Sequence, residues 1–93
     1  MNNRLVILSD NRTNDARLET EHGLSIYMEG PSGKFLLDTG ASDLFVRNAA
    51  LLGIDLSDID YCLISHGHSD HIGGLNAFLT INSKAKVILS AQI

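Results

Sequence analysis

The chain has 93 residues, of which 44% are hydrophobic and 19% are charged, and this composition is typical of one globular domain. Seven Lys and Arg residues against eleven Asp and Glu residues give a net charge of −4, and the basic residues form no block, which argues against a nucleic-acid partner. No run approaches the roughly 18 apolar residues that a membrane span needs, so we expect no membrane segment.

The first predicted element is a strand over Arg4–Ser9, whose continuous apolar centre indicates burial on both faces. That apolar run is shorter than the roughly 7–15 residues of a signal-peptide core. The single cysteine, Cys62, has no partner for a disulfide within the chain and agrees with a reducing compartment. We therefore expect a cytoplasmic protein.

A polar connection over residues 10–22 leads to a β-hairpin predicted over residues 24–37, with its turn at residues 29–33. The sequence Asp38-Thr39-Gly40 ends the second strand of this hairpin. A helix is predicted next, with Ser42 as its N-cap and Gly53 just beyond its C-terminal end. The residues expected on its apolar face are Leu44, Phe45, Ala49, Leu51 and Leu52.

The second half of the chain alternates short strands and helices. Residues 55–60 predict an acidic turn with one helical turn capped by Ser57, and residues 61–65 predict a buried strand. A helix over residues 74–81, with Leu75, Phe78 and Leu79 on one face, precedes a last strand over Lys86–Leu89. We expect an α/β (α+β layered) fold in a single domain over residues 1–93.

Metal-binding chemistry is concentrated in one loop after the predicted strand 61–65, which reads His66-Gly67-His68-Ser69-Asp70-His71. Imidazoles two residues apart in an extended chain lie on one side and can bind one cation. Asp70 and His71 are adjacent, so they tend to point apart and can serve a second position. Imidazoles with a carboxylate suit zinc, with iron and manganese as alternatives.

This loop carries a resemblance to a known family. Residues 65–75, Ser-His-Gly-His-Ser-Asp-His-Ile-Gly-Gly-Leu, resemble the His-x-His-x-Asp-His signature loop of the metallo-β-lactamase superfamily. Residues 35–40, Phe-Leu-Leu-Asp-Thr-Gly, are similar to the family's strand that ends in Asp-Thr-Gly. Residues 9–11 and 21–25 further resemble the branch related to the dihydropterin ribofuranosyl-aminobenzene phosphate synthases. The resemblance covers the N-terminal portion of the family's usual domain, which implies the N-terminal half of an αββα sandwich.

The resemblance implies a role for each motif residue. His66 and His68 match ligands of the first divalent metal, and Asp70 with His71 matches ligands of the second. Asp70 is also the family's candidate catalytic residue, which orients or deprotonates the water between the metals. Asp38 matches a carboxylate that supports the loop by hydrogen bonding, and an ordinary turn residue is the alternative. The implied reaction is hydrolysis of an unknown small-molecule ester, amide, thioester or phosphoester by a metal-activated water.

The sequence departs from the family pattern after this loop. The family completes its site with two later histidines and a bridging aspartate, but here no histidine follows His71 and no acidic residue follows Asp70. A catalytic zinc usually has three protein ligands, so we expect this chain to hold only half of a site. The alternative is a non-catalytic truncated fragment, or an oligomeric assembly unit with weak metal binding.

Three further features have a functional and an ordinary interpretation. His22 either lines the pocket or is simply solvated, and the strand-end residues Asp10 and Asn11 either face a site or form a turn. The Gly73-Gly74 pair either lets backbone N–H groups approach an anionic substrate or makes a packing-driven turn. The predicted sheet also lacks a facing layer, so we expect either a homodimer or a missing C-terminal half to cover it.

Overall fold

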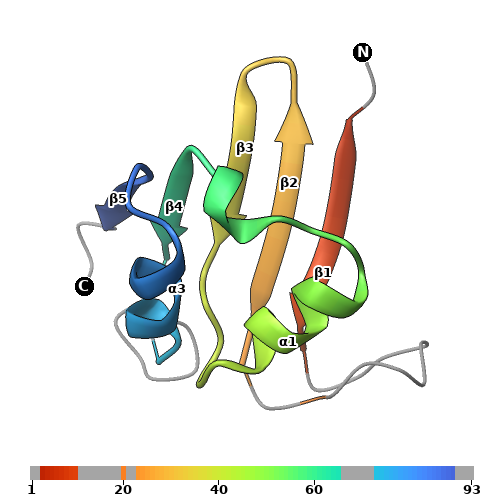
Figure 1. Ribbon diagram of the computed structural model, residues 1–93, viewed down its shortest axis with the longest axis vertical. Coiled ribbons are helices and arrows are strands. Elements are labelled where there is room, and N and C mark those ends of the chain that lie inside the picture. The colour runs from red at the N-terminus through yellow and green to blue at the C-terminus, as the bar shows by residue number, and fades with distance from the viewer. Residues whose placement is uncertain (1–2, 11–19, 21–22, 66–72, 90–93) are drawn as a thin grey trace.

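The protein forms one mixed β-sheet with two α-helices, as the computed structural model in Figure 1 shows. The structure describes residues 3–10, 20, 23–65 and 73–89. The strands are β1 (Arg4–Ser9), β2 (Ser25–Gly30), β3 (Gly33–Leu37), β4 (Tyr61–Ile64) and β5 (Lys86–Leu89). The helices are α1 (Leu44–Leu51), the short 3-10 helix η1 (Leu56–Asp58) and α3 (Leu75–Ile81). The predicted elements are therefore present, and the α+β fold class is confirmed.

The strands follow one another across the sheet in the order β1-β2-β3-β4-β5. The first three pair antiparallel, and the hairpin between β2 and β3 closes at the pair Gly30 and Gly33. The next pairings, β3 with β4 and β4 with β5, are parallel, with α1 and α3 as the connections. Four strands, β1, β3, β4 and β5, therefore end at the same edge of the sheet, the lower edge in Figure 1.

Both α-helices lie against one face of the sheet (Figure 1). The row of strand residues on that face, read across the sheet by register, is Val6, Tyr27, Leu36, Cys62 and Val87. These side chains pack with the buried residues Phe45, Ala49, Ile59 and Phe78 to form the hydrophobic core. None of the described helices has the length and hydropathy to cross a membrane.

The opposite face of the sheet is apolar and open in the described part of the protein. Two rows of side chains cross it: Leu5, Met28, Phe35, Tyr61 and Lys86, and then Ile7, Ile26, Leu37, Leu63 and Ile88. Leu5 is 64% exposed and Ile7 is 48% exposed. The prediction that the first strand is buried on both faces is therefore wrong, because the helices cover only one side of the sheet.

The end of α1 follows the prediction more closely than its start. Gly53 has φ +73°, its N–H donates to the carbonyl of Ala50 at 3.3 Å, and the N–H of Ile54 donates to the carbonyl of Ala49 at 2.9 Å. This pair of bonds is a Schellman C-cap, which favours glycine. At the start, the N-cap position falls on Asp43, whose side chain makes no cap bond, whereas the hydroxyl of the predicted Ser42 accepts from the N–H of Leu44 at 3.3 Å.

Two leucines predicted on the apolar helix faces, Leu51 and Leu79, are each 48% exposed. Asn48 is buried on α1 instead, where its side-chain amide donates to the carbonyl of Leu8 at 2.9 Å. This hydrogen bond joins α1 to the end of β1, and it allows a polar side chain to face the core without an unmet donor.

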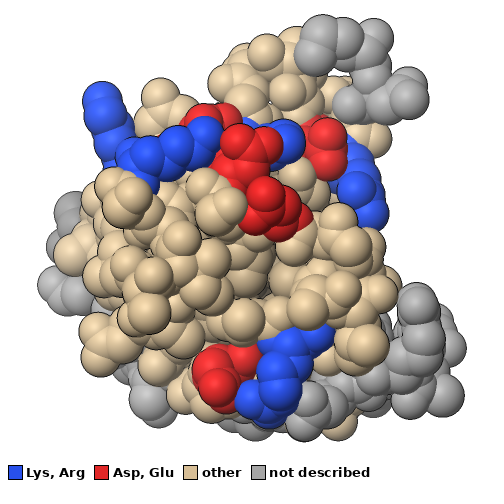
Figure 2. Space-filling model, viewed as in Figure 1, with Lys and Arg blue, Asp and Glu red and all other residues tan. Residues whose placement is uncertain are grey.

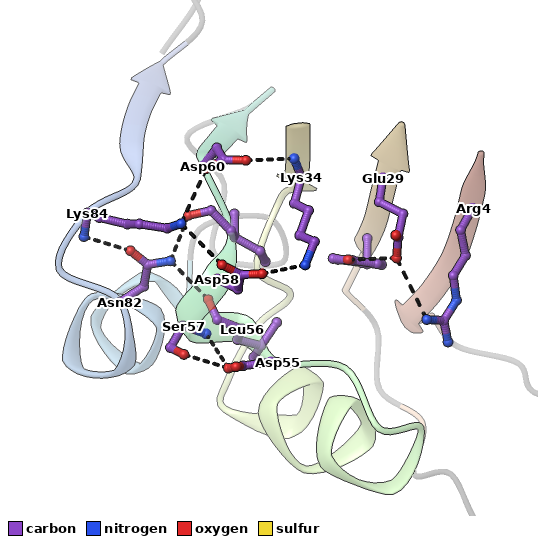
Figure 3. A network of polar contacts seen from close by, with 12 residues as sticks. Arg4, Glu29, Lys34, Asp55, Leu56, Ser57, Asp58, Asp60, Asn82 and Lys84 are labelled. Atoms are coloured by element: carbon purple, nitrogen blue, oxygen red, sulfur yellow. Dashed lines mark hydrogen bonds and ion pairs between the residues drawn. The ribbon is translucent and has the colours of Figure 1, made fainter. Parts of the chain in front are cut away.

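Charged side chains gather along the upper edge of the sheet, opposite the edge where β3 and β4 end (Figure 2). Figure 3 shows Asp58 between two lysines, with an ion pair to Lys34 and another to Lys84 at 3.2 Å. The hydrogen bond from Lys34, followed by that from Lys84, lowers the pKa of the Asp58 carboxyl. These groups are exposed to solvent, so the pairs contribute little to stability.

Below this charged edge, the buried side chain of Asn82 joins η1 to the loop before β5 (Figure 3). Its amide nitrogen donates to the carbonyls of Leu56 and Ile59, and its oxygen accepts from the N–H groups of Lys84 and Ala85. The cap of η1 also differs from the prediction. Asp55 is the N-cap and accepts from the N–H of Ser57 at 3.0 Å, so Ser57 is the donor and not the cap.

Cys62 is fully buried on β4, in agreement with the buried strand predicted over residues 61–65. Burial, with the nearby charge of Asp38 as a smaller cause, raises the pKa of its thiol to about 12. We expect the native thiol to resist a disulfide reagent at pH 8, because the reactive thiolate is scarce and shielded. A spectrophotometric thiol assay measures the reaction, and in urea the same thiol should react rapidly. Rapid labelling of the native protein would contradict this prediction.

Candidate metal centre

The predicted metal ligands His66, His68, Asp70 and His71 lie outside the described residues, as do Asn11 and His22. Within the described ranges, no group of three or more His, Cys, Asp or Glu side chains is placed to hold a metal. The site is therefore defined by what surrounds the segment 66–72 in the chain. That segment leaves β4 at Ser65 and re-enters the described structure at residue 73, just before α3.

The turn at residues 38–40, which follows β3, forms the base of the candidate site. Asp38 has φ +59°, in the left-handed region that few residues other than glycine adopt, although Asp and Asn tolerate it best. Its side chain is fully buried, and so is that of Thr39. A buried carboxylate on a left-handed backbone is a combination that is common at functional sites.

Ser65 connects this turn to the end of β4. Its N–H donates to Oδ1 of Asp38 at 2.7 Å, and its hydroxyl donates to Oδ2 of Asp38 at 2.6 Å. The two residues are 27 positions apart in the sequence, but β3 and β4 are parallel neighbours, so their carboxyl ends meet. Both carboxylate oxygens of Asp38 therefore hold the residue immediately before His66.

Gly74 brings the other end of the segment to the same turn. Its N–H donates to the carbonyl of Gly40 at 3.2 Å. A Cβ atom at this position would lie 2.4 Å from the carbonyl oxygens of Thr39 and Ser42, and 2.5 Å from the ring of Phe45. This close approach favours the packing interpretation of Gly74, since its N–H is already bonded within the protein and not free for an anion.

Other candidate residues at this edge have structural partners. Ser9 is buried at the end of β1, and its hydroxyl donates to the carbonyl of Gly23 at 2.7 Å. Ser25 is also buried, and its hydroxyl donates to the carbonyl of Asp38 at 2.8 Å. Asp10 is half-buried immediately after β1, at the same edge. Of these contacts, the Ser25 bond connects the start of β2 to the 38–40 turn.

Sequence reasoning did not identify Ser65 as a contributor to the site. One signal for its role was available. Strands 33–37 and 61–64 are short apolar runs joined by a helix, which is typical of parallel neighbours, and the residues after such strands share one edge. A serine after one strand and an aspartate after the other are then candidates for a hydrogen bond.

The donor set of the segment fits a divalent transition-metal ion. Three imidazoles and a carboxylate are ligands that zinc, iron and manganese accept. The described surroundings agree with this chemistry. Both carboxylate oxygens of Asp38 accept hydrogen bonds from Ser65, the residue directly before His66 in the sequence. Metal sites commonly depend on such supporting hydrogen bonds to orient their ligands.

Comparison with known families gives a match over most of the chain. A model described as the metallo-beta-lactamase superfamily matches residues 18–91. Among solved structures, a metal-dependent hydrolase of the beta-lactamase superfamily superimposes with a TM-score of 0.68 and 33% identity. The alignment covers 94% of this chain and 43% of that one.

Curated relatives match shorter stretches. A UPF0173 metal-dependent hydrolase of Enterococcus faecalis is 43% identical over 53 residues, which are 55% of this chain and 23% of the relative. The 7,8-dihydropterin-6-methyl-4-(beta-D-ribofuranosyl)-aminobenzene-5'-phosphate synthase of Methanocaldococcus jannaschii is 38% identical over 61 residues, which are 60% of this chain and 21% of the relative. The chain thus spans less than a quarter of the length of either relative.

Proposed function

The chain belongs to the metallo-beta-lactamase superfamily, and from that premise we propose that it supplies part of the active site of a metal-dependent hydrolase. One observation carries this proposal. The segment with the four ligand-type side chains begins directly after Ser65, at the end of β4. Both carboxylate oxygens of the buried Asp38 accept hydrogen bonds from Ser65. A solvated polar loop would not need this support, whereas a metal site requires its ligands to be oriented.

Each motif residue has a proposed role. His66 and His68 hold the first metal ion, and Asp70 and His71 hold the second. Zinc is the proposed metal, with iron and manganese as alternatives. A metal ion bound there would activate a water molecule for hydrolysis. Asp70 would also accept a proton from that water or orient it, and the substrate would be a small molecule with an ester, amide, thioester or phosphoester bond.

Asp38 is proposed to act through the loop rather than on a substrate. Its carboxylate is buried and bonded to Ser65, so it can orient the start of the segment that carries the ligands. Its left-handed backbone, with φ +59°, agrees with such a role, because strained backbone is concentrated at functional sites.

The chain by itself offers two protein ligands per metal, since no histidine follows His71 and no acidic residue follows Asp70. A catalytic zinc usually has three. We therefore propose that this chain holds half of a site. The sequence also favours a second candidate function, a non-catalytic fragment or assembly unit that binds metal weakly.

Metal binding tests the first proposal. We expect the wild-type chain to retain zinc after dialysis, with an affinity below that of a complete site, because each metal lacks a third ligand. The double variant His66→Ala/His68→Ala should lose this zinc, measured by atomic absorption. His22→Ala is the matched control, because it removes the histidine outside the motif and should retain the wild-type metal content. Equal zinc in the double variant and the wild type would exclude the proposed ligands.

The open sheet face leads to a proposal about assembly. We propose that a second copy of the chain or a C-terminal half of the fold covers the two apolar rows, because a bare face of this kind exceeds what soluble monomers tolerate. A homodimer would be self-consistent, since one patch serves both subunits. The lone buried thiol of Cys62 also agrees with the cytoplasm as the proposed location.

Sedimentation velocity at micromolar concentration tests the dimer. We expect the wild-type chain to dimerise, and Ile7→Lys to shift it toward the monomer by placing a charge on the open face. Leu51→Lys is the matched control, because Leu51 is equally exposed, at 48%, but lies on α1 away from that face. A wild-type monomer that binds no hydrophobic dye would contradict the proposal.

A further inference from the structure

We draw no further inference here: the strongest candidate, the open apolar face of the sheet on which Phe35 stacks against Tyr61, carries nothing beyond the assembly already proposed, because nothing in the described part of the structure shows what covers it.

Discussion

Replacing Asp38 by alanine should lower the free energy of unfolding by about 3–6 kcal/mol, because two hydrogen bonds to a carboxylate, each worth about 1.5–3 kcal/mol, are lost together. The carboxylate of Asp38 is fully buried and Ser65 is half-buried, so water can replace the lost partner of Ser65 only in part. Alanine would also have to adopt φ +59°, which adds about 1–2 kcal/mol. Urea denaturation followed by circular dichroism measures the change.

Two further substitutions at the same position separate these causes. Asp38→Asn keeps one acceptor and tolerates the left-handed backbone, so we expect it to retain more stability than Asp38→Ala. Asp38→Gly removes the backbone strain but leaves both bonds unmade, and it should fall between the two. If Asp38→Ala differs from the wild type by less than about 0.5 kcal/mol, the carboxylate is not a structural support.

Gly74→Ala is expected to be the other severe substitution, at about 3 kcal/mol or more, which is the upper part of the range for overpacking. The added Cβ would lie 2.4 Å from two carbonyl oxygens, those of Thr39 and Ser42. Backbone oxygens cannot rotate away as the end of a side chain can, so the turn and the start of α3 must separate. The same denaturation experiment measures this loss.

Gly53→Ala provides the control for Gly74→Ala. Gly53 has φ +73° but no atom within 4 Å of an added Cβ, so its cost is backbone strain alone, about 1–2 kcal/mol. Gly74→Ala should therefore destabilise the protein more than Gly53→Ala. Equal losses would mean that the contact between Gly74 and the 38–40 turn is not tight in solution.

The two edges of the sheet have different roles in this arrangement. The upper edge carries exposed ion pairs around Asp58 and the saturated amide of Asn82 (Figure 3), and these connect η1 to the loop before β5. The lower edge carries the hydrogen bonds between the buried carboxylate of Asp38 and the half-buried Ser65. Hydrogen bonds to a carboxylate are stronger than exposed ion pairs, so we expect the lower edge to contribute more to stability than the upper edge.

Local patterns predicted the elements well and their finer contacts less well. The first and last strands have the predicted bounds, and the C-cap at Gly53 was also predicted. The predicted cap at Ser57 was wrong, because Asp55 caps η1. At the start of α1 the N-cap position is Asp43, but the side chain that accepts a helix N–H is that of the predicted Ser42. The predicted burial of Leu51 and Leu79 was also wrong.

The sequence alone determined the strands, the helices, the family and the residue types of the proposed metal loop, because these depend on periodicity and on residues that are neighbours in the chain. Tertiary structure alone decided which face of the sheet is covered and that Ser65 lies against Asp38. It also decided that Gly74 closes against the 38–40 turn. These contacts join residues far apart in the chain, and they exist only because β3 and β4 lie side by side and parallel, so that their carboxyl ends meet at one edge of the sheet.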